Sequence, residues 1–303
     1  MRVTLFHNPE AGHRRSNAKE LEEIARSLGH AVTLQSLVQP DWADALDDPG
    51  ELVVIAGGDG TVGAVATKMI GRPQPIALLP MGTANNVARS LGFVGAPRDL
   101  MRAWNDAKPQ GFDVGLAESD GVARPFLECV GVGEFGRLMA HAHALEHGGR
   151  EEDREAKLLR DLAILRERVA TSEGQGVSLL LDGVDKSGEY LLAEILNVWT
   201  IGPRLGLAPT AAVDDGRLHA VLVGPDHRAK LVRYLERLRN GEPGHPELEV
   251  VPATRIELSC KVHDLHLDGE LWEGDSPLVE PDQRVTVRLS VLHQALRFLC
   301  RAA

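Results

Sequence analysis

The feature that most constrains this 303-residue chain is a short apolar run that breaks directly into glycines. Residues 51–56 (Glu-Leu-Val-Val-Ile-Ala) lead into Gly57-Gly58-Asp59-Gly60-Thr61. A β-branched run that ends in consecutive glycines is typical of a buried strand entering a tight loop. Glycine lets the backbone approach a ligand closely, and the first N–H groups of the helix expected from Val62 onward would attract anions. The junction therefore predicts a phosphate-binding loop in an α/β fold, with a plain surface turn as the less favoured interpretation.

The aspartate inside this loop indicates a cation. Asp59 would repel a phosphate unless a cation lay between them, and Mg²⁺ prefers oxygen ligands of this kind. A loop acid in an exposed cleft contributes little to packing, so we expect Asp59 to be replaceable without loss of the fold. The nucleotide-binding residues expected here are Gly57, Gly58, Asp59, Gly60, Thr61 and Val62.

A second junction repeats the pattern. Residues 76–80 (Ile-Ala-Leu-Leu-Pro) are apolar and lead into residues 81–86 (Met-Gly-Thr-Ala-Asn-Asn). Thr83 is expected to cap a helix over residues 84–91. Ligands bind at the carboxyl ends of strands in open α/β sheets, so Gly82, Thr83 and Asn86 are predicted to share the nucleotide site. Taken alone, the segment is equally consistent with ordinary helix capping.

The order of the predicted elements divides the chain into two domains. Strand and helix patterns alternate over residues 1–111, which predicts an α/β nucleotide-binding domain with a parallel sheet. Residues 112–291 are mostly strand-like and predict a mainly antiparallel β-sandwich. A helical insertion is expected near residues 137–170, where apolar residues recur at helical spacing. The tail, residues 292–303, is expected to pack back on the first domain.

Composition and charge narrow the class of partner. The formal net charge is −11 and no arginine-rich stripe is visible, so nucleic acid is not expected as a partner. The three cysteines are far apart and suggest reduced thiols rather than a disulfide framework. The amino terminus enters a strand pattern at once, and no apolar stretch is long enough to span a bilayer. These observations predict a cytoplasmic enzyme.

Five short motifs follow one another along the chain. They are residues 8–12 (Asn-Pro-Glu-Ala-Gly), 57–61, 80–86, 214–218 (Asp-Asp-Gly-Arg-Leu) and 268–270 (Asp-Gly-Glu). Taken in order, they resemble the motifs of the diacylglycerol kinase catalytic family, which includes bacterial diacylglycerol kinases, YegS-like lipid kinases, and sphingosine and ceramide kinases. The resemblance extends from near the amino terminus to about residue 272.

The resemblance implies a kinase that uses ATP and Mg²⁺ to phosphorylate the hydroxyl group of a lipid or lipid-like alcohol, with the acceptor lipid bound by the β-rich domain of residues 112–291. Asn8, Pro9 and Gly12 would line the nucleotide site on the first strand-to-helix loop. Thr33, expected at the end of the second strand, would reach the nucleoside. Transient contact with a membrane surface and a homodimer are the expected associations.

The two later motifs imply a base and a second metal. By resemblance, Glu270 is the proton acceptor and Asp268 its neighbour, although Asp-Gly is also a strong hairpin signal. In an extended segment their side chains would share one side. Asp215 would hold a structural Mg²⁺ together with the carbonyl groups of Ala212 and Arg217, although composition alone favours a simple turn there.

One departure from the family bears on the activity. Many members carry an aspartate where this chain has Asn86, and an amide cannot replace a carboxylate as a metal ligand with the same strength. Either Asp113 or Glu270 supplies the missing carboxylate, or the acceptor is not diacylglycerol, or the activity is weak. A nucleotide-binding regulatory protein with little turnover is therefore one alternative.

A second alternative comes from the first loop, because NAD kinases share its Gly-Gly-Asp-Gly-Thr sequence. An NAD kinase-like enzyme would act on a soluble substrate, although the Asn-Glu pair expected of it is lacking at Asn197-Val198.

Overall fold

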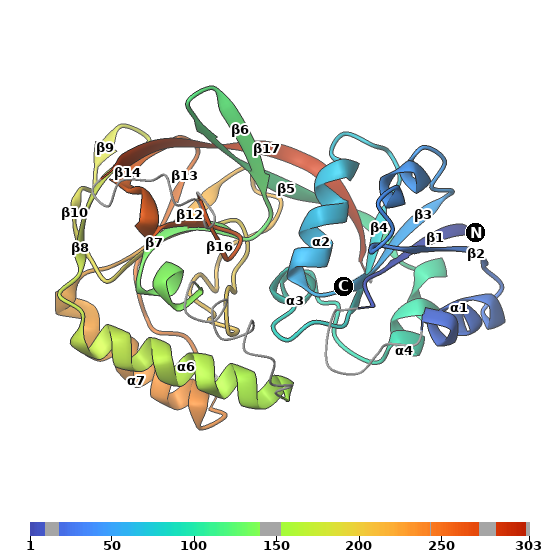
Figure 1. Cartoon of the computed structure of the whole chain (residues 1–303), viewed down its shortest axis with the longest axis horizontal. Coiled ribbons are helices and arrows are strands. Elements are labelled where there is room, and N and C mark those ends of the chain that lie inside the picture. The colour runs from blue at the N-terminus through green and yellow to red at the C-terminus, as the bar shows by residue number, and fades with distance from the viewer. Residues whose placement is uncertain (10–17, 140–152, 243, 273–282, 301–303) are drawn as a thin grey trace. The chain divides into compact units, whose positions relative to one another are not determined.

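The computed structural model describes residues 1–9, 18–139, 153–242, 244–272 and 283–300. The chain divides into two compact units, which Figure 1 shows in the colours of the sequence. Unit 1 comprises Met1–Asp113 and His293–Ala303, and unit 2 comprises Val114–Leu292. The chain passes from one unit to the other within two strands, β5 (Lys108–Ser119) and β17 (Arg284–Cys300).

Unit 1 is built on a parallel sheet. Its strands lie in the order β4 (Ile76–Pro80), β3 (Leu52–Gly57), β1 (Arg2–His7) and β2 (Ala31–Ser36). All of β3 is buried, as its apolar sequence predicts. In the register His7 pairs with Ala56, and Gly57 pairs with Pro80. The carboxyl ends of β1, β3 and β4 therefore meet at one edge of the sheet.

Two helices of unit 1 begin at residues other than those that the sequence predicts. They are α1 (Ala18–Ser27), α2 (Asp59–Ala66), α3 (Asn86–Ser90) and α4 (Pro97–Arg102), with short 3₁₀ turns over Trp42–Leu46, Thr67–Met69 and Ala103–Asn105. The helix expected from Val62 already starts at Asp59. The helix expected from residue 84 starts only at Asn86, because Asn85 has a left-handed backbone (φ 55°) that cannot continue a helix.

Unit 2 contains two antiparallel sheets. One has the order β10 (Gly188–Tyr190), β8 (Gln175–Leu181), β14 (Ile256–Lys261) and β17, with β9 (Val184–Asp185) at its edge and the β5–β6 hairpin (β6, Val122–Phe126) beside β17. The other has the order β13 (Val250–Ala253), β12 (Leu218–Val223), β11 (Leu192–Leu196), β7 (Cys129–Gly133), β15 (Leu265–Leu267) and β16 (Glu270–Leu271).

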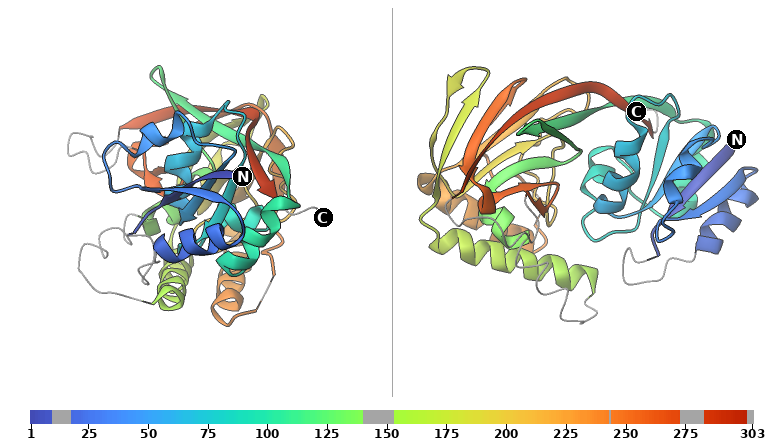
Figure 2. Two further views of the ribbon diagram at one scale, coloured as in Figure 1. Left: turned by 90° about the vertical axis from the view of Figure 1, so that its right-hand side faces the viewer. Right: turned by 45° about the horizontal axis from the view of Figure 1, so that its top comes forward.

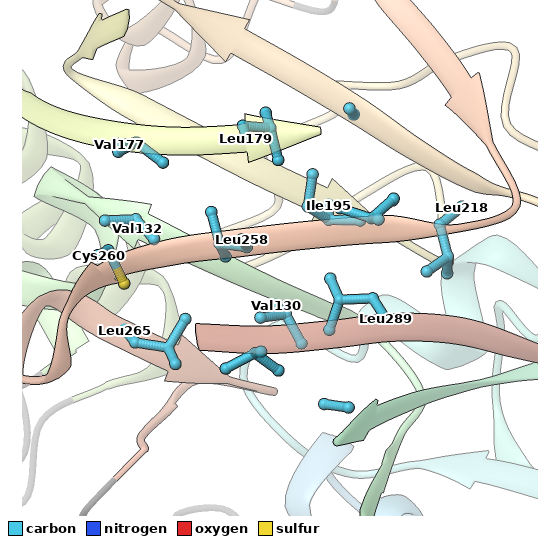
Figure 3. Packing of buried hydrophobic residues seen from close by; sticks show 14 of the residues in the cluster. Val130, Val132, Val177, Leu179, Ile195, Leu218, Leu258, Cys260, Leu265 and Leu289 are labelled. Atoms are coloured by element: carbon cyan, nitrogen blue, oxygen red, sulfur yellow. The ribbon is translucent and has the colours of Figure 1, made fainter. Parts of the chain in front are cut away.

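The apolar core of unit 2 lies between these sheets (Figure 3). Val130 and Ile195 from one sheet and Leu179, Leu258 and Leu289 from the other are all at most 2% exposed. Two sheets that bury one shared face form a β-sandwich. The predicted fold class, a parallel α/β domain followed by an antiparallel β-sandwich, is confirmed.

Two long helices of unit 2, α6 (Arg154–Thr171) and α7 (Arg228–Arg239), pack side by side (Figures 1 and 2). Leu158, Leu162, Leu165 and Val169 form the buried stripe that their spacing predicts on α6. Helix α7 was absent from the sequence prediction. None of the helices in the described part of the chain is both long and apolar enough to cross a membrane.

Candidate functional site

The two glycine loops of unit 1 touch each other. A Cβ atom at Gly82 would lie 2.5 Å from the Cα atom of Gly58, and the N–H of Met81 donates to the carbonyl oxygen of Gly57 at 2.8 Å. The backbones are so close that a larger residue at position 82 would push them apart. The loops after β3 and β4 therefore lie in contact with each other at one edge of the sheet.

Asp59 ties these loops together. Its Oδ1 atom accepts a hydrogen bond from the N–H of Val87 at 3.1 Å, at the start of α3. Burial raises the pKa of the Asp59 carboxyl group, and nearby backbone N–H groups, foremost that of Asn86, oppose the shift. The residue is half-buried and opens α2. The expectation of an exposed loop acid is therefore wrong, because the half-buried carboxylate accepts a hydrogen bond from the backbone at the start of α3.

Thr61 and Asn8 bring the first strand into the site. The Nδ2 group of Asn8 donates to Oγ1 of Thr61 at 3.3 Å. Thr61 is buried beneath Gly57, where an added Cβ would lie 2.4 Å from the threonine Cβ. Pro9 is exposed directly after Asn8, whereas Gly12 lies outside the described residues. The structure therefore brings Asn8 and Thr61 together, with the threonine beneath the loop rather than on its surface.

Asn85 organises the second loop. Its side chain accepts from the N–H of Gly82 and donates to the carbonyl oxygen of the same residue, both at 2.8 Å. Asn85 is the N-cap residue of α3 by its position, although its side chain makes no capping hydrogen bond to the helix, and the expectation that Thr83 takes this position is wrong. Thr83 is half-buried on the loop, and the Asn86 side chain is buried in the first turn of α3.

Two other residues of unit 1 do not lie where the sequence suggested. Thr33 is in the middle of β2, opposite Thr4 and three residues before the strand ends at Ser36, so it is not at the carboxyl edge. Asp113 is buried, and its Oδ1 atom accepts from the N–H of Gln294 at 2.7 Å and lies 2.9 Å from Nδ1 of His293. Its carboxylate is therefore engaged with the returning strand β17.

In unit 2, Asp268 and Gly269 form the two-residue turn between β15 and β16, with φ of 48° and 84°. The Asp268 carboxylate accepts from the N–H groups of Leu127 and Glu128 at 2.8 Å and of Cys129 at 3.0 Å. Burial raises the pKa of Asp268 to about 6, although these N–H groups lower it. The left-handed turn also means that residues 268 and 270 are not in one extended segment, so the predicted shared side is wrong.

Glu270 stands in contrast to its neighbour. It is exposed at the start of β16, opposite Leu267. Within the described residues, no side-chain hydrogen bond or ion pair engages it. The hairpin therefore presents one carboxylate to solvent and uses the other as an anchor.

The third acidic motif forms a compact turn. One carboxylate oxygen of Asp215 accepts from the N–H of Arg217 at 3.0 Å, and the other lies 3.3 Å from Nε2 of His219. Burial lowers the pKa of His219, while Asp215 raises it. Ala212, Asp215 and Arg217 are all exposed in this turn. The sequence predicts their proximity but not the buried histidine.

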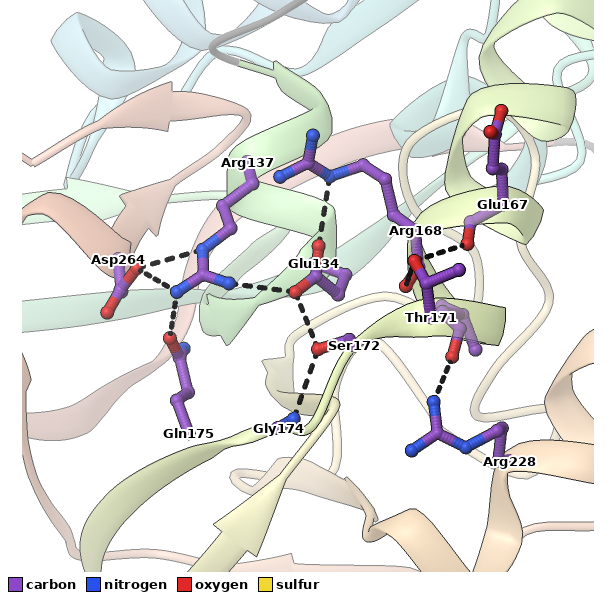
Figure 4. Close-up of polar contacts among 11 residues, drawn as sticks. Glu134, Arg137, Glu167, Arg168, Thr171, Ser172, Gly174, Gln175, Arg228 and Asp264 are labelled. Atoms are coloured by element: carbon purple, nitrogen blue, oxygen red, sulfur yellow. Dashed lines mark hydrogen bonds and ion pairs between the residues drawn. The ribbon is translucent and has the colours of Figure 1, made fainter.

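A polar network around Glu134 escaped the sequence analysis (Figure 4). The buried Glu134 carboxylate accepts from Arg137, Arg168 and Ser172 at 2.8–2.9 Å. Arg137 also bonds Asp264; burial lowers the pKa of this arginine, but the charges of Asp264 and Glu134 outweigh that effect and raise it. Glu134 and Arg137 are three residues apart on one helical segment, which a sequence can indicate, whereas Arg168 lies 34 residues away.

Comparison with known families identifies both parts of the chain. Residues 2–117 match the diacylglycerol kinase catalytic domain. Residues 142–300 match the YegS C-terminal NAD kinase beta sandwich-like domain. The two matches follow one another in the order of the two units.

Whole-chain relatives agree with these matches. A protein from Pseudomonas putida named "Probable lipid kinase YegS-like" is 32% identical over 254 residues, covering 83% of this chain and 79% of the relative. A diacylglycerol kinase from Mycobacterium tuberculosis is 25% identical over 284 residues, covering 89% and 88%. The crystal structure of a diacylglycerol kinase from Bacillus anthracis shares the fold with a TM-score of 0.68 at 18% identity, covering 99% and 96%.

Proposed function

This chain belongs to the diacylglycerol kinase family, among its YegS-like lipid kinases, and from this premise we propose that it transfers the γ-phosphoryl group of ATP to the hydroxyl group of a diacylglycerol-type lipid. The observation that carries the proposal is the close approach of Gly58 and Gly82 at the carboxyl edge of the parallel sheet. Two loops without side chains at their point of contact leave backbone N–H groups that a phosphate could approach closely.

In this proposal unit 1 binds ATP. The residues that we assign to ATP are Asn8, Pro9, Gly57, Gly58, Asp59, Gly60, Thr61, Val62, Gly82, Thr83 and Asn86, on the segments that follow β1, β3 and β4, together with Gly12, which lies outside the described residues. Thr33 is left out, because it lies in the middle of its strand.

Mg²⁺ belongs to the same proposal, and Asp59 would hold it. A carboxylate among neutral amides and glycines suits an oxygen-seeking cation. When bound, the ion would neutralise charge on the transferring phosphoryl group. Because Asp59 also holds the N–H of Val87, metal binding would be linked to the position of α3. We assign a second, structural Mg²⁺ to the turn with Asp215 and the carbonyl groups of Ala212 and Arg217.

Glu270 is the proposed base for the acceptor hydroxyl. Its carboxylate is exposed, whereas Asp268 is occupied by three backbone N–H groups. A general base needs a free acceptor oxygen within reach of the proton it removes. Asp268 would then act as a positioning residue that holds the hairpin.

The proposal also covers location and assembly. A lipid acceptor would be reached by transient contact with a membrane surface, and the net charge of −11 argues against nucleic acid as a partner. We place the enzyme in the cytoplasm and propose a homodimer, which analytical ultracentrifugation would test.

Phosphoryl transfer from labelled ATP would test the function directly. The full-length protein would be given vesicles with diacylglycerol, sphingoid base, ceramide or phosphatidylglycerol, and separately NAD in solution. We expect label in a lipid, and loss of that label in Asp59→Ala but not in Asp106→Ala, an exposed aspartate of the same unit. Label only in NAD would instead support the NAD kinase-like alternative, and ATP binding without transfer would support a regulatory protein.

A further inference from the structure

Away from the proposed kinase residues, three metal-binding side chains meet on neighbouring strands of unit 2. Cys129 of β7, Glu194 of β11 and His266 of β15 each offer a ligand atom, and these atoms all lie within 4.8 Å of one another. Strand β7 lies between β11 and β15. In the described part of the chain, no other group of three His, Cys, Asp or Glu side chains is close enough to share an ion.

Gly131 is what allows these side chains to meet. Glu194 and His266 both pair with Gly131, one on each side of β7. A Cβ atom at Gly131 would lie 1.8 Å from Oε2 of Glu194 and 2.6 Å from Nε2 of His266. Cys129 is two residues earlier on the same strand and so points to the same face. The absent side chain therefore leaves room for three donors to converge over β7.

The convergence point is enclosed by protein. Glu194 and His266 have no exposed surface, and Cys129 is 1% exposed. Residues adjacent to them in sequence, such as Val130 and Ile195, point into the apolar core, so the three donors face the other side of the sheet. There the ring of Phe135 packs edge-on against His266 at 5.0 Å between ring centres.

A hydrogen-bonded pair alone leaves part of this cluster unexplained. Removing a carboxylate from water costs several kcal/mol unless it is compensated. The partner of Glu194 is Nε2 of His266, at 3.0 Å and 3.2 Å from its two oxygens. In the described structure the His266 imidazole is the one side-chain hydrogen-bond partner of the Glu194 carboxylate, and Cys129 takes no part in the pair. An ion between the three would engage all of them.

We propose that Cys129, Glu194 and His266 bind one Zn²⁺ ion as a structural site within unit 2. Thiolate, imidazole and carboxylate are ligands that suit zinc, whereas Mg²⁺ takes oxygen ligands. The separations of 3.0 and 3.2 Å between Nε2 of His266 and the two Glu194 oxygens are compatible with ligands that each lie roughly 2.0–2.2 Å from a shared ion, and the Cys129 sulfur lies within 4.8 Å of both side chains. Both Glu194 oxygens face the histidine, so a bidentate carboxylate would raise the donor number to four. The thiol proton leaves to solvent, and thiolate and carboxylate together balance the charge of the ion.

Cobalt is the probe for this site, because Co²⁺ bound to a thiolate has a charge-transfer band in the near ultraviolet that oxygen-only sites lack. The full chain would be unfolded in urea and refolded with one equivalent of Co²⁺ in excess Mg²⁺, so that burial does not prevent entry. We expect the band to appear, and to be lost when one equivalent of Zn²⁺ is also present during refolding. Refolded protein with native circular dichroism and no band would overturn the proposal.

Two buried cysteines of unit 2 provide the matched variants. Cys129→Ala should abolish the band and weaken Zn²⁺ binding at least tenfold in equilibrium dialysis. Cys260→Ala, on β14 in the opposite sheet, should keep both the charge-transfer band and the Zn²⁺ affinity of the wild type. Equal Zn²⁺ binding by the two variants would place the metal elsewhere and contradict the assignment, and that comparison uses only variants whose circular dichroism matches the wild type.

Discussion

Unit 2 contains the same three residues, Leu-Asp-Gly, at two hairpins, and the two copies behave differently. Asp182-Gly183 joins β8 to β9 and Asp268-Gly269 joins β15 to β16, with φ of 47° and 84° in the first and 48° and 84° in the second. In each, the aspartate N–H donates to a carbonyl of a neighbouring segment, Arg255 or Cys129. In each, the carboxylate accepts backbone N–H groups of that same segment.

The difference lies in the surroundings of the carboxylate. Asp182 is exposed, and hydrogen bonds from Arg255 and Thr254 lower its pKa. Asp268 accepts three N–H groups, but burial dominates and raises its pKa to about 6. Hydrogen bonds favour the charged carboxylate and desolvation opposes it, so the same motif titrates in opposite directions.

The comparison separates the aspartate from the glutamate in the Asp-Gly-Glu motif. An aspartate that anchors a hairpin occurs in both turns, so the anchor by itself implies no catalysis. What differs after the glycine is Val184 in one hairpin and Glu270 in the other. The hairpin with the exposed glutamate is therefore the one to test for a base.

The largest expected effect is on the reaction rate. Glu270→Gln should lower kcat roughly 10²–10⁴-fold, the usual effect of losing a general base, with ATP affinity by calorimetry little changed. Asp268→Asn should have a smaller effect, because it alters the anchor and not the base. Asp182→Asn and Glu118→Gln, at exposed positions of the same unit, should match the wild type. A fully active Glu270→Gln beside an inactive Asp268→Asn would reverse the roles.

The fold class was predictable because it depends on local patterns. The strands β3 and β4 are near-continuous apolar runs, and such runs are what a parallel sheet with both faces covered requires. The stripe on α6 is likewise a property of neighbouring turns. Helix starts were less predictable, since α3 begins only after Asn85, whose left-handed backbone (φ 55°) the sequence pattern does not indicate.

The candidate site was predictable in its residues but not in their contacts. Asp59 was expected near the second loop, but the N–H group that donates to it belongs to Val87, which is 28 residues away in the sequence. The N–H groups that donate to Asp268 are about 140 residues away in the sequence. Glu194 and His266 are 72 residues apart and meet only through the register of β11, β7 and β15. Such contacts follow from strand pairing, which no short motif encodes.

The next effect is on stability. Asp268→Ala would leave three N–H groups without their acceptor and should lower the free energy of unfolding by roughly 2–4 kcal/mol, because each unsatisfied group costs about 1–3 kcal/mol and water replaces part of the loss. Asp182→Ala should cost about 1 kcal/mol, because its partners are already reached by solvent. Urea denaturation of both variants measures the difference. Equal losses would show that burial does not distinguish the two anchors.

The pH dependence of stability should have opposite signs at the two hairpins. Asp268 has a folded pKa near 6, above its ordinary 3.8, so its contribution is full below 3.8 and is lost as the pH rises toward 6, by at most about 1.4 kcal/mol per pH unit. Asp182 has a lowered pKa, so its contribution is present above 3.8 and is lost as the pH falls below it.

Free energies of unfolding measured across this pH range would reveal both losses of stability. Asp268→Asn should flatten the loss on the neutral side, and Asp182→Asn should flatten the loss on the acid side. If Asp268→Asn lost as much stability as the wild type when the pH rises toward 6, burial of the Asp268 carboxylate would not be the cause of that loss.

The smallest expected difference is between the stability costs of replacing the two turn glycines. It tests whether the two hairpins have equivalent backbones. Gly183 and Gly269 share φ of 84°, where an L-residue is strained. A Cβ at Gly183 would meet no atom within 4 Å, and one at Gly269 would meet only Sδ of Met139 at an ordinary 3.5 Å. Gly183→Ala and Gly269→Ala should therefore each lower the free energy of unfolding by about 1–2 kcal/mol, from backbone strain alone. Equal costs in urea denaturation would assign the contrast between the hairpins to the surroundings of their carboxylates. A much larger cost at Gly269 would mean that the Asp-Gly-Glu turn is held more tightly than its twin, and the raised pKa of Asp268 would then reflect the whole hairpin and not the carboxylate alone.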